Sequence, residues 1–111
     1  MAIAHAQSGD PIDIRPLGPR LATEKNIALF KSDQLEVIRL VLLAGKVFPA
    51  HAVPGEITVQ CIEGEIDITV EGESHVLKAG QILFLAGNVP HGVVALQDSS
   101  ALLTIVLKPS S

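Results

Sequence analysis

The 111-residue sequence contains no tryptophan and no tyrosine, and it has only three phenylalanines and one cysteine. Nucleic-acid-binding surfaces typically combine aromatic side chains, on which bases stack, with basic clusters that hold phosphates. This chain instead carries a formal net charge of −4, so we expect no nucleic-acid partner. The single Cys61 cannot form an internal disulfide, which is compatible with a reducing compartment.

Long hydrophobic runs are also missing. No apolar stretch approaches the roughly 20 residues that a membrane-spanning helix needs, so we expect no membrane partner. The first residues include an alanine-rich segment, but it is not preceded by the apolar stretch of about seven or more residues that a secretory signal peptide has. Together these absences predict a cytoplasmic protein.

Aliphatic side chains are abundant. Hydrophobic residues make up 48% of the sequence, and most are Val, Ile, Leu and Ala, which favours β-strands. We expect no helix. The proline- and glycine-rich residues 1–24 are predicted to form an N-terminal arm, and residues 25–111 a single all-β domain. Strands are predicted at residues 26–31, 35–43, 46–49, 56–62, 65–71, 74–77, 81–85, 91–96 and 101–107.

Two of these strands need cover on both faces. In residues 65–71 apolar and polar side chains alternate, as in a strand with one buried face and one face in water. Residues 37–43 and 101–107 are apolar on both faces, and the interior of a single domain can bury only one of them. The N-terminal arm, a second subunit, or both must cover the other face. We expect a homodimer, because large exposed apolar patches are rare on monomers.

Two segments with glycine, proline and histidine at defined positions stand out. In residues 45–64, Gly45 precedes His51 by six positions and Gly64 closes the segment. In residues 80–91, Gly80 precedes His91 by eleven positions. These segments resemble the two sequence motifs of the cupin family.

The resemblance is incomplete at several motif positions, two of which hold metal ligands in the family. The first family motif has a second histidine and a glutamate where this chain has Val53 and Ile57. The second has proline, glycine and asparagine where this chain has Ala86, Asn88 and Ala95. The resemblance implies a cupin-type jelly roll, or conical β-barrel, with a pocket inside. It leaves half of the usual ligand set without a counterpart.

The resemblance also implies that His51 and His91 converge in that pocket. They could hold a divalent transition metal such as Zn, Fe, Mn or Ni. A third ligand would have to come from Glu56 or Gln60, which requires a one-residue bulge at Pro54–Gly55 to turn them inward. In the alternative, no metal is present and the two histidines contact water or an organic ligand.

Strand parity predicts the rest of the pocket. Side chains two positions apart point to the same face, so the residues in step with His51 and His91 should line the interior. This set comprises Val53, Ile57, Val59, Cys61, Val93 and Ala95. Without a bulge, Glu56, Thr58 and Gln60 face the other way. Arg39, within an apolar strand, is a candidate contact for an anionic ligand or a buried acid, or else an edge residue with its head in water.

These observations support a small-molecule-binding function, either in a metal-dependent enzyme or in a binding or sensor protein without a metal. A purely structural domain, with side chains filling the barrel, is the third alternative. The sequence does not identify the ligand. The fold itself cannot decide among these alternatives, because folds of this kind carry many chemistries.

Overall fold

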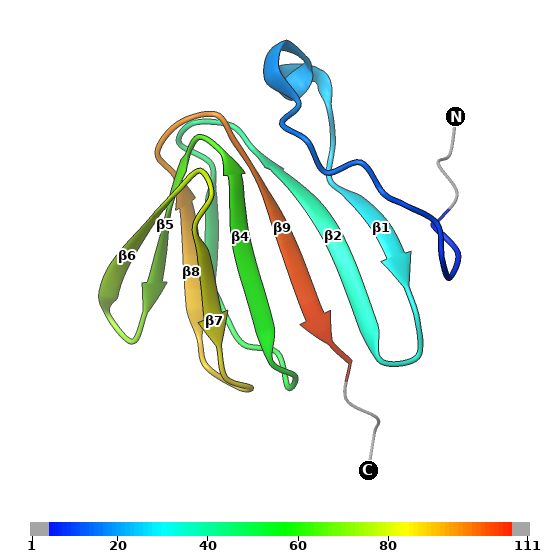
Figure 1. Ribbon diagram of the computed structural model, residues 1–111. Helices are drawn as coiled ribbons and strands as arrows, with labels where there is room; N and C mark the ends of the chain where they lie inside the picture. Colours follow the sequence, from blue (N-terminus) through cyan, green and yellow to red (C-terminus); the bar gives the residue numbers. More distant parts are fainter. Residues whose placement is uncertain (1–4, 108–111) are drawn as a thin grey trace.

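The structure is a computed structural model that describes residues 5–107. Within this range it has one short 3₁₀ helix and nine strands (Figure 1). They are η1 (Gly18–Thr23), β1 (Ile27–Lys31), β2 (Leu35–Leu42), β3 (Val47–His51), β4 (Ile57–Glu63), β5 (Glu65–Val70), β6 (Glu73–Lys78), β7 (Ile82–Leu85), β8 (His91–Ala95) and β9 (Ser99–Val106). None of the described helices is long and apolar enough to cross a membrane.

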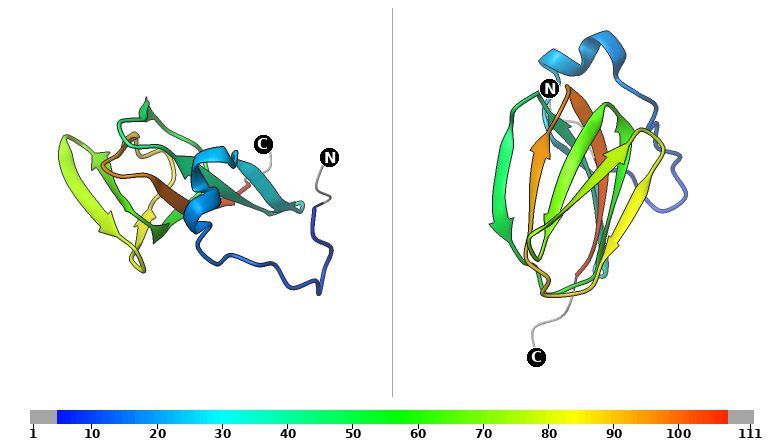
Figure 2. Two further views of the ribbon diagram at one scale, coloured as in Figure 1. Left: turned by 90° about the horizontal axis from the view of Figure 1, so that it is seen from above. Right: turned by 90° about the vertical axis from the view of Figure 1, so that its left-hand side faces the viewer.

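The strands form two antiparallel sheets that face each other (Figures 1 and 2). One sheet has the order β1-β2-β9-β4-β7, and the other has the order β3-β8-β5-β6. Consecutive strands pair in β1–β2 and β5–β6, whereas other neighbours are distant in sequence, as in the pairing of β2 with β9 and of β5 with β8. This arrangement is a jelly roll, and it confirms the predicted all-β fold.

The core lies between the two sheets. On β4, Ile57, Val59 and Cys61 point inward and are at most 4% exposed, while Thr58 and Gln60 between them are only partly buried. On β5, Ile66 and Ile68 are completely buried. The period of two that the sequence predicts for residues 65–71 is therefore observed on this strand.

A tight turn at Gly64 joins β4 to β5. Its φ angle is +81°, a left-handed conformation that residues with a Cβ rarely adopt. A Cβ at this position would also collide with the Ser99 side chain and the Asp98 carbonyl. The glycine that closes the first motif is thus required both by the turn and by the approach of the neighbouring chain.

The N-terminal arm lies against the outer face of the five-stranded sheet. It contains the 3₁₀ helix η1, a departure from the expectation of no helix; Pro19, in its first turn, has a φ angle preset for helical backbone. Two side chains from the barrel hold the arm. Arg39 of β2 donates hydrogen bonds to the carbonyls of Asp13 and Arg15, and Glu63 of β4 accepts them from two arm amides.

Glu63 is a meeting point of the arm and the barrel. Its carboxylate accepts hydrogen bonds from the amides of Leu17, at 2.8 Å, and Gly18, at 3.0 Å, and from the hydroxyl of Ser100. Burial raises the pKa of the Glu63 carboxyl, but these hydrogen bonds outweigh it, so that the pKa is lowered overall. The ionised carboxylate is therefore the form that anchors the arm.

We expect Glu63→Gln to loosen the arm, because an amide is a weaker acceptor than a carboxylate and places an N–H opposite one of the donors. The loss should be about 1–2 kcal/mol of docking free energy. Hydrogen exchange at the amides of Leu17 and Gly18 would measure it. Acidification of the wild type should also loosen the arm. Because the pKa of Glu63 is lower in the folded protein than its unfolded value of about 4.3, the ionised carboxylate stabilises the docked arm fully above that value. This stabilisation is lost as the pH falls through the folded-state pKa of Glu63. Equal protection of these amides in both proteins would contradict the anchoring role.

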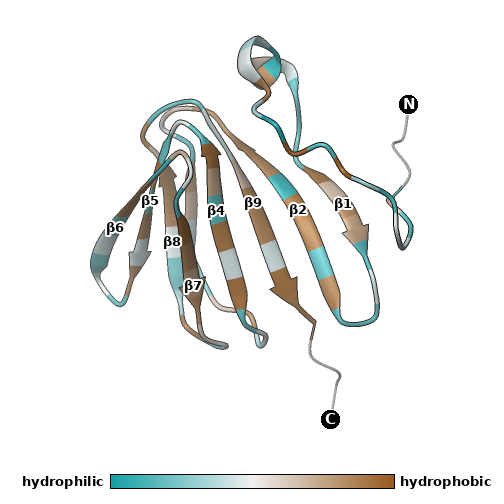
Figure 3. Ribbon diagram, in the orientation of Figure 1, coloured by the Kyte–Doolittle hydropathy of each residue, from teal (hydrophilic) through white to brown (hydrophobic). Residues whose placement is uncertain are grey.

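Part of the outer face of the five-stranded sheet remains apolar and exposed. Figure 3 shows hydrophobic residues along β2, β9 and β7. Ile82 and Phe84 of β7 are each 61% exposed, and Leu35 of β2 and Val106 of β9 are 39% and 38% exposed. The arm contacts Arg39 and Glu63, whereas these four side chains stay accessible.

We expect this outer face to pair with a second copy of the chain. Light scattering at micromolar concentration should give about twice the 11.7 kDa mass of one chain. Phe84→Glu should shift the mass to that of a monomer, because it places a charge in the paired face. Val76→Glu is the matched control, since Val76 is 46% exposed on the other sheet. A monomer mass for the wild type would contradict the dimer and leave the arm as the sole cover.

Candidate functional site

A cavity of about 230 Å³ lies between the two sheets. Ten of the residues that line it are apolar, and the other two are His51 and His91. The apolar residues are Leu40, Leu42, Phe48, Val53, Ile57, Val59, Ile66, Val93, Leu103 and Ile105. The two imidazoles are therefore the polar side chains available to a molecule in this cavity.

The two histidines come together because β3 and β8 are paired. His51 and His91 are directly opposite each other in the ladder, and their ring centroids are 4.8 Å apart with an interplanar angle of 44°. His91 is 6% exposed, whereas His51 is exposed at the end of its strand. The pair thus extends from the interior of the cavity to its edge.

A register shift in β3 orients His51. The shift lies between Phe48 and His51, on an edge strand that also accommodates Pro49. In a regular strand, residues three apart point to opposite faces, but with the extra residue both Phe48 and His51 line the cavity. The register shift of β3 therefore precedes Pro54–Gly55, the position at which the sequence analysis considers a bulge.

The hydrogen bonding of His91 fixes its tautomer. Its Nδ1 lies 3.1 Å from the carbonyl oxygen of Val89. A carbonyl oxygen can only accept a hydrogen bond, so in the neutral ring Nδ1 carries the proton and Nε2 keeps its lone pair. Nε2 is then free to accept a hydrogen bond from a ligand or to coordinate a metal ion.

Four of the residues predicted from parity line the cavity with the two histidines: Val53, Ile57, Val59 and Val93. Cys61 and Ala95 face inward as predicted, but they lie in the packed core outside the cavity lining, at 0% and 2% exposure. Burial raises the pKa of the Cys61 thiol, which keeps it protonated and unreactive.

Arg39 does not belong to this cavity. It pairs with Leu102 of β9 and faces outward, where its guanidinium lies beneath the arm. Parity within residues 37–43 could not decide its direction, because that strand is apolar on both faces.

The structure also places Glu56 and Gln60 outside the cavity. The Glu56 side chain is exposed, and its carbonyl accepts a hydrogen bond from the amide of Val106 at 2.9 Å. Gln60 lies between the inward-facing Val59 and Cys61, so it points to the outer face. Neither supplies a third ligand beside His51 and His91.

Sequence reasoning missed six apolar residues of the cavity wall, most of them on other strands. They are Leu40, Leu42, Phe48, Ile66, Leu103 and Ile105. A signal was present for Phe48, which lies three residues before His51, but period-two parity assigned it to the other face. For the strands of Leu40 and Leu103, apolar residues on both faces hid which ones point inward.

The donor set does not fit a resident metal ion held by three or more protein ligands. In the part of the chain from residue 5 to 107, no group of three or more His, Cys, Asp or Glu side chains is arranged to hold one. At the two further family positions, Val53 and Ile57 present aliphatic side chains to the cavity. Structural and catalytic metal sites normally use at least three protein ligands.

Residues 38–107 match the sequence pattern of the family described as the cupin domain. The chain belongs to the cupin family. The matched region runs from β2 to the end of β9 and includes the cavity and both histidines. A comparison with curated protein sequences gave no significant match.

Several solved structures resemble this one in fold. An RmlC-like cupin from Shewanella frigidimarina is 24% identical with a TM-score of 0.71, over 77% of each chain. KdgF from Halomonas sp. is 20% identical with a TM-score of 0.71, over 77% of this chain and 79% of that one. The DMSP lyase DddQ from Ruegeria pomeroyi is 23% identical with a TM-score of 0.69, over 78% of this chain and 48% of that one. At these identities the likeness establishes the fold alone.

We expect the purified protein to contain much less than one transition-metal ion per chain, because two imidazoles alone make a weak site. Elemental analysis after purification without chelators would measure this. The double variant Val53→His, Ile57→Glu is the positive control, since it supplies side chains at the two family positions and should raise the metal content. A wild-type protein with one tightly held ion per chain would contradict this assignment of the donor set.

Proposed function

We propose that this cupin binds a small, mostly apolar organic molecule in the cavity between its sheets, with His91 and His51 contacting the molecule's one polar group. The observation that carries the proposal is the composition of the cavity wall, which is aliphatic or aromatic except for the two imidazoles. Ligand sites are commonly of this kind, apolar with a few polar groups that fix orientation.

The size of the cavity limits the ligand. A cavity of about 150 Å³ lined by apolar side chains holds benzene in another, engineered protein. The present cavity, at about 230 Å³, has room for a somewhat larger molecule, such as a substituted benzene ring or a short branched chain. Desolvation of such a molecule supplies about 25 cal/mol for each Å² of apolar surface buried.

The histidines determine which polar group is accepted. The lone pair on Nε2 of His91 favours a ligand that donates a hydrogen bond, such as a phenol or an alcohol. His51, at the exposed end of β3, can contact the same group or a water molecule beside it. A ligand without a donor would leave Nε2 of the buried His91 without a partner, which costs about 1–3 kcal/mol.

This proposal assigns a binding or sensor function in the cytoplasm, without a resident metal. The second candidate is an enzyme that uses a divalent transition metal held by His51 and His91. The Nδ1 contact of His91 with a backbone carbonyl favours it, because metal-ligating histidines are commonly held in this way. The side chains of Val53 and Ile57 weigh against it, and they support the metal-free proposal.

Titration of the ¹⁵N-labelled protein with p-cresol, followed by NMR, tests the proposal. We expect p-cresol to shift the amides around His91 and Val93, and toluene, which lacks the hydroxyl, to bind more weakly. His91→Leu should reduce the preference for p-cresol over toluene about 2- to 10-fold, as expected for one hydrogen bond.

Val53→Phe provides the matched steric test, because the larger side chain fills part of the cavity without touching the His91 contact. It should weaken both probes by about tenfold or more. Thr58→Ser, on the outer face of β4, should change neither affinity. The proposal is wrong if neither probe shifts cavity amides at millimolar concentration, or if Val53→Phe binds both probes as the wild type does.

A further inference from the structure

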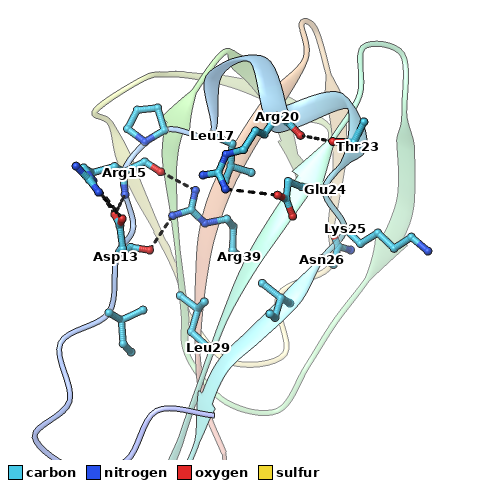
Figure 4. A pocket seen from close by; sticks show the side chains of 13 residues that line it. Asp13, Arg15, Leu17, Arg20, Thr23, Glu24, Lys25, Asn26, Leu29 and Arg39 are labelled. Carbon is cyan, nitrogen blue, oxygen red and sulfur yellow. Dashed lines mark hydrogen bonds and ion pairs between the residues drawn. The ribbon is translucent and has the colours of Figure 1, made fainter. Parts of the chain in front are cut away.

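A groove of about 990 Å³ separates the N-terminal arm from the outer face of β1 and β2 (Figure 4). It is on the opposite side of the five-stranded sheet from the cavity. Its charged lining consists of Arg15, Arg20, Lys25 and Arg39 together with Asp13 and Glu24. Positive side chains thus outnumber negative ones here, in a chain whose net charge is −4.

Arg39 is the buried charge in this groove. The residue is 5% exposed, and its guanidinium donates to the carbonyls of Arg15, at 2.8 Å, and Asp13, at 3.2 Å. A guanidinium has five N–H donors, so three remain without a hydrogen bond to the described residues. Among residues 5–107, no carboxylate oxygen lies within 4 Å of it. The carboxylates of Asp13 and Glu63 are near enough to interact electrostatically with Arg39, but neither forms an ion pair with it. A buried charge without a counter-ion in direct contact is unfavourable, and an anion in the groove would relieve the cost.

The other charges differ in how strongly they are already paired. Arg15 and Asp13 form a close ion pair at 2.7 Å, and the hydrogen bond from Arg15 holds the pKa of Asp13 well below its usual range. Arg20 is only loosely paired, with 3.7 Å between its nitrogen and a Glu24 oxygen. In Figure 4 the Lys25 side chain extends away from Arg39. Arg39 and Arg20 are therefore the two arginines of the groove that are least committed to a carboxylate.

The remaining lining of the groove is mainly aliphatic. Ile12 and Leu17 of the arm line it together with Ile27 and Leu29 of β1. A fully hydrated inorganic anion would gain nothing from these side chains, whereas an anion with an apolar body would bury part of that body against them. The fork of an arginine matches the two oxygens of a carboxylate.

We propose that this groove binds an organic carboxylate with a short apolar body. The carboxylate lies on the free donors of Arg39 and Arg20, and the apolar body packs against Leu17 and Leu29. The site is independent of the proposed cavity function, because it uses other residues on the other face of the sheet. Its ligand also stabilises the docked arm, since Arg39 holds the arm carbonyls while it binds the anion.

The test is an NMR titration of the ¹⁵N-labelled full chain with hexanoate, and with hexan-1-ol as its neutral counterpart. We expect hexanoate to shift the amides of residues 13–17 and of β2 around Arg39, and hexan-1-ol to shift them much less. Arg39→Lys, which keeps the charge but loses the fork, should weaken hexanoate binding about tenfold. Arg20→Ala should weaken it about 2- to 5-fold, as expected for an exposed ionic contact.

Two variants control for a general effect of charge and for release of the arm. Lys31→Ala removes a charge from β1 outside the groove lining and should leave the affinity unchanged. Arg39→Lys could weaken hexanoate binding by releasing the arm. Arg20→Ala leaves both hydrogen bonds of Arg39 to the arm in place, so its effect on the affinity reports the ionic contact alone.

The inference is overturned if hexanoate shifts no arm amides, if hexan-1-ol shifts them equally, or if either Arg20→Ala or Arg39→Lys binds hexanoate as the wild type does. Shifts confined to the amides around His51 and His91 would overturn it as well, because hexanoate would then bind in the cavity and not in the groove. If p-cresol does not bind in the cavity but hexanoate shifts the arm amides, the cavity function is wrong and this inference stands. The two proposals therefore fail independently.

Discussion

Packing of the inner faces of the two sheets is the constraint on which the rest of this structure depends. With no tryptophan or tyrosine in the sequence, the space between the sheets is filled by aliphatic side chains, and the largest completely buried ones are Leu42, Ile66 and Ile68. These side chains close the core around Cys61 and Ala101, but they do not fill the space toward His51 and His91. The cavity is thus what remains of the interior when short apolar side chains pack it.

The five-stranded sheet has two apolar faces, and each of them needs cover from water. Its inner face forms the core and the cavity, whereas its outer face is partly covered by the N-terminal arm. Polar groups of the barrel hold the arm, because Glu63 accepts hydrogen bonds from its amides and Arg39 donates to its carbonyls. Leu21 of η1 is also buried. The strength of this contact depends on the charges of Glu63 and Arg39 and on ligands that compete for their hydrogen bonds.

Membership of the cupin family explains the scaffold and the convergence of the two histidines, but not the chemistry of the cavity. The chain retains one histidine from each motif and replaces two other ligand positions with Val53 and Ile57. Each replacement removes a donor and adds apolar surface to the same wall. The combined effect favours desolvation of an organic molecule over coordination of a metal ion.

The fold and part of the site could be predicted from the amino-acid sequence. Alternation and turn residues located all the described strands to within a few positions, and motif spacing together with parity brought Val53, Ile57, Val59 and Val93 to the histidines. The tertiary structure alone decided three further features: the register shift that turns Phe48 and His51 to one face, the depth at which the cavity ends before Cys61 and Ala95, and the outward direction of Arg39. Each depends on partners distant in the chain. Periodicity records which side chains share a face of one strand, but not what lies opposite that face, which only the packing of the sheets and the arm determines.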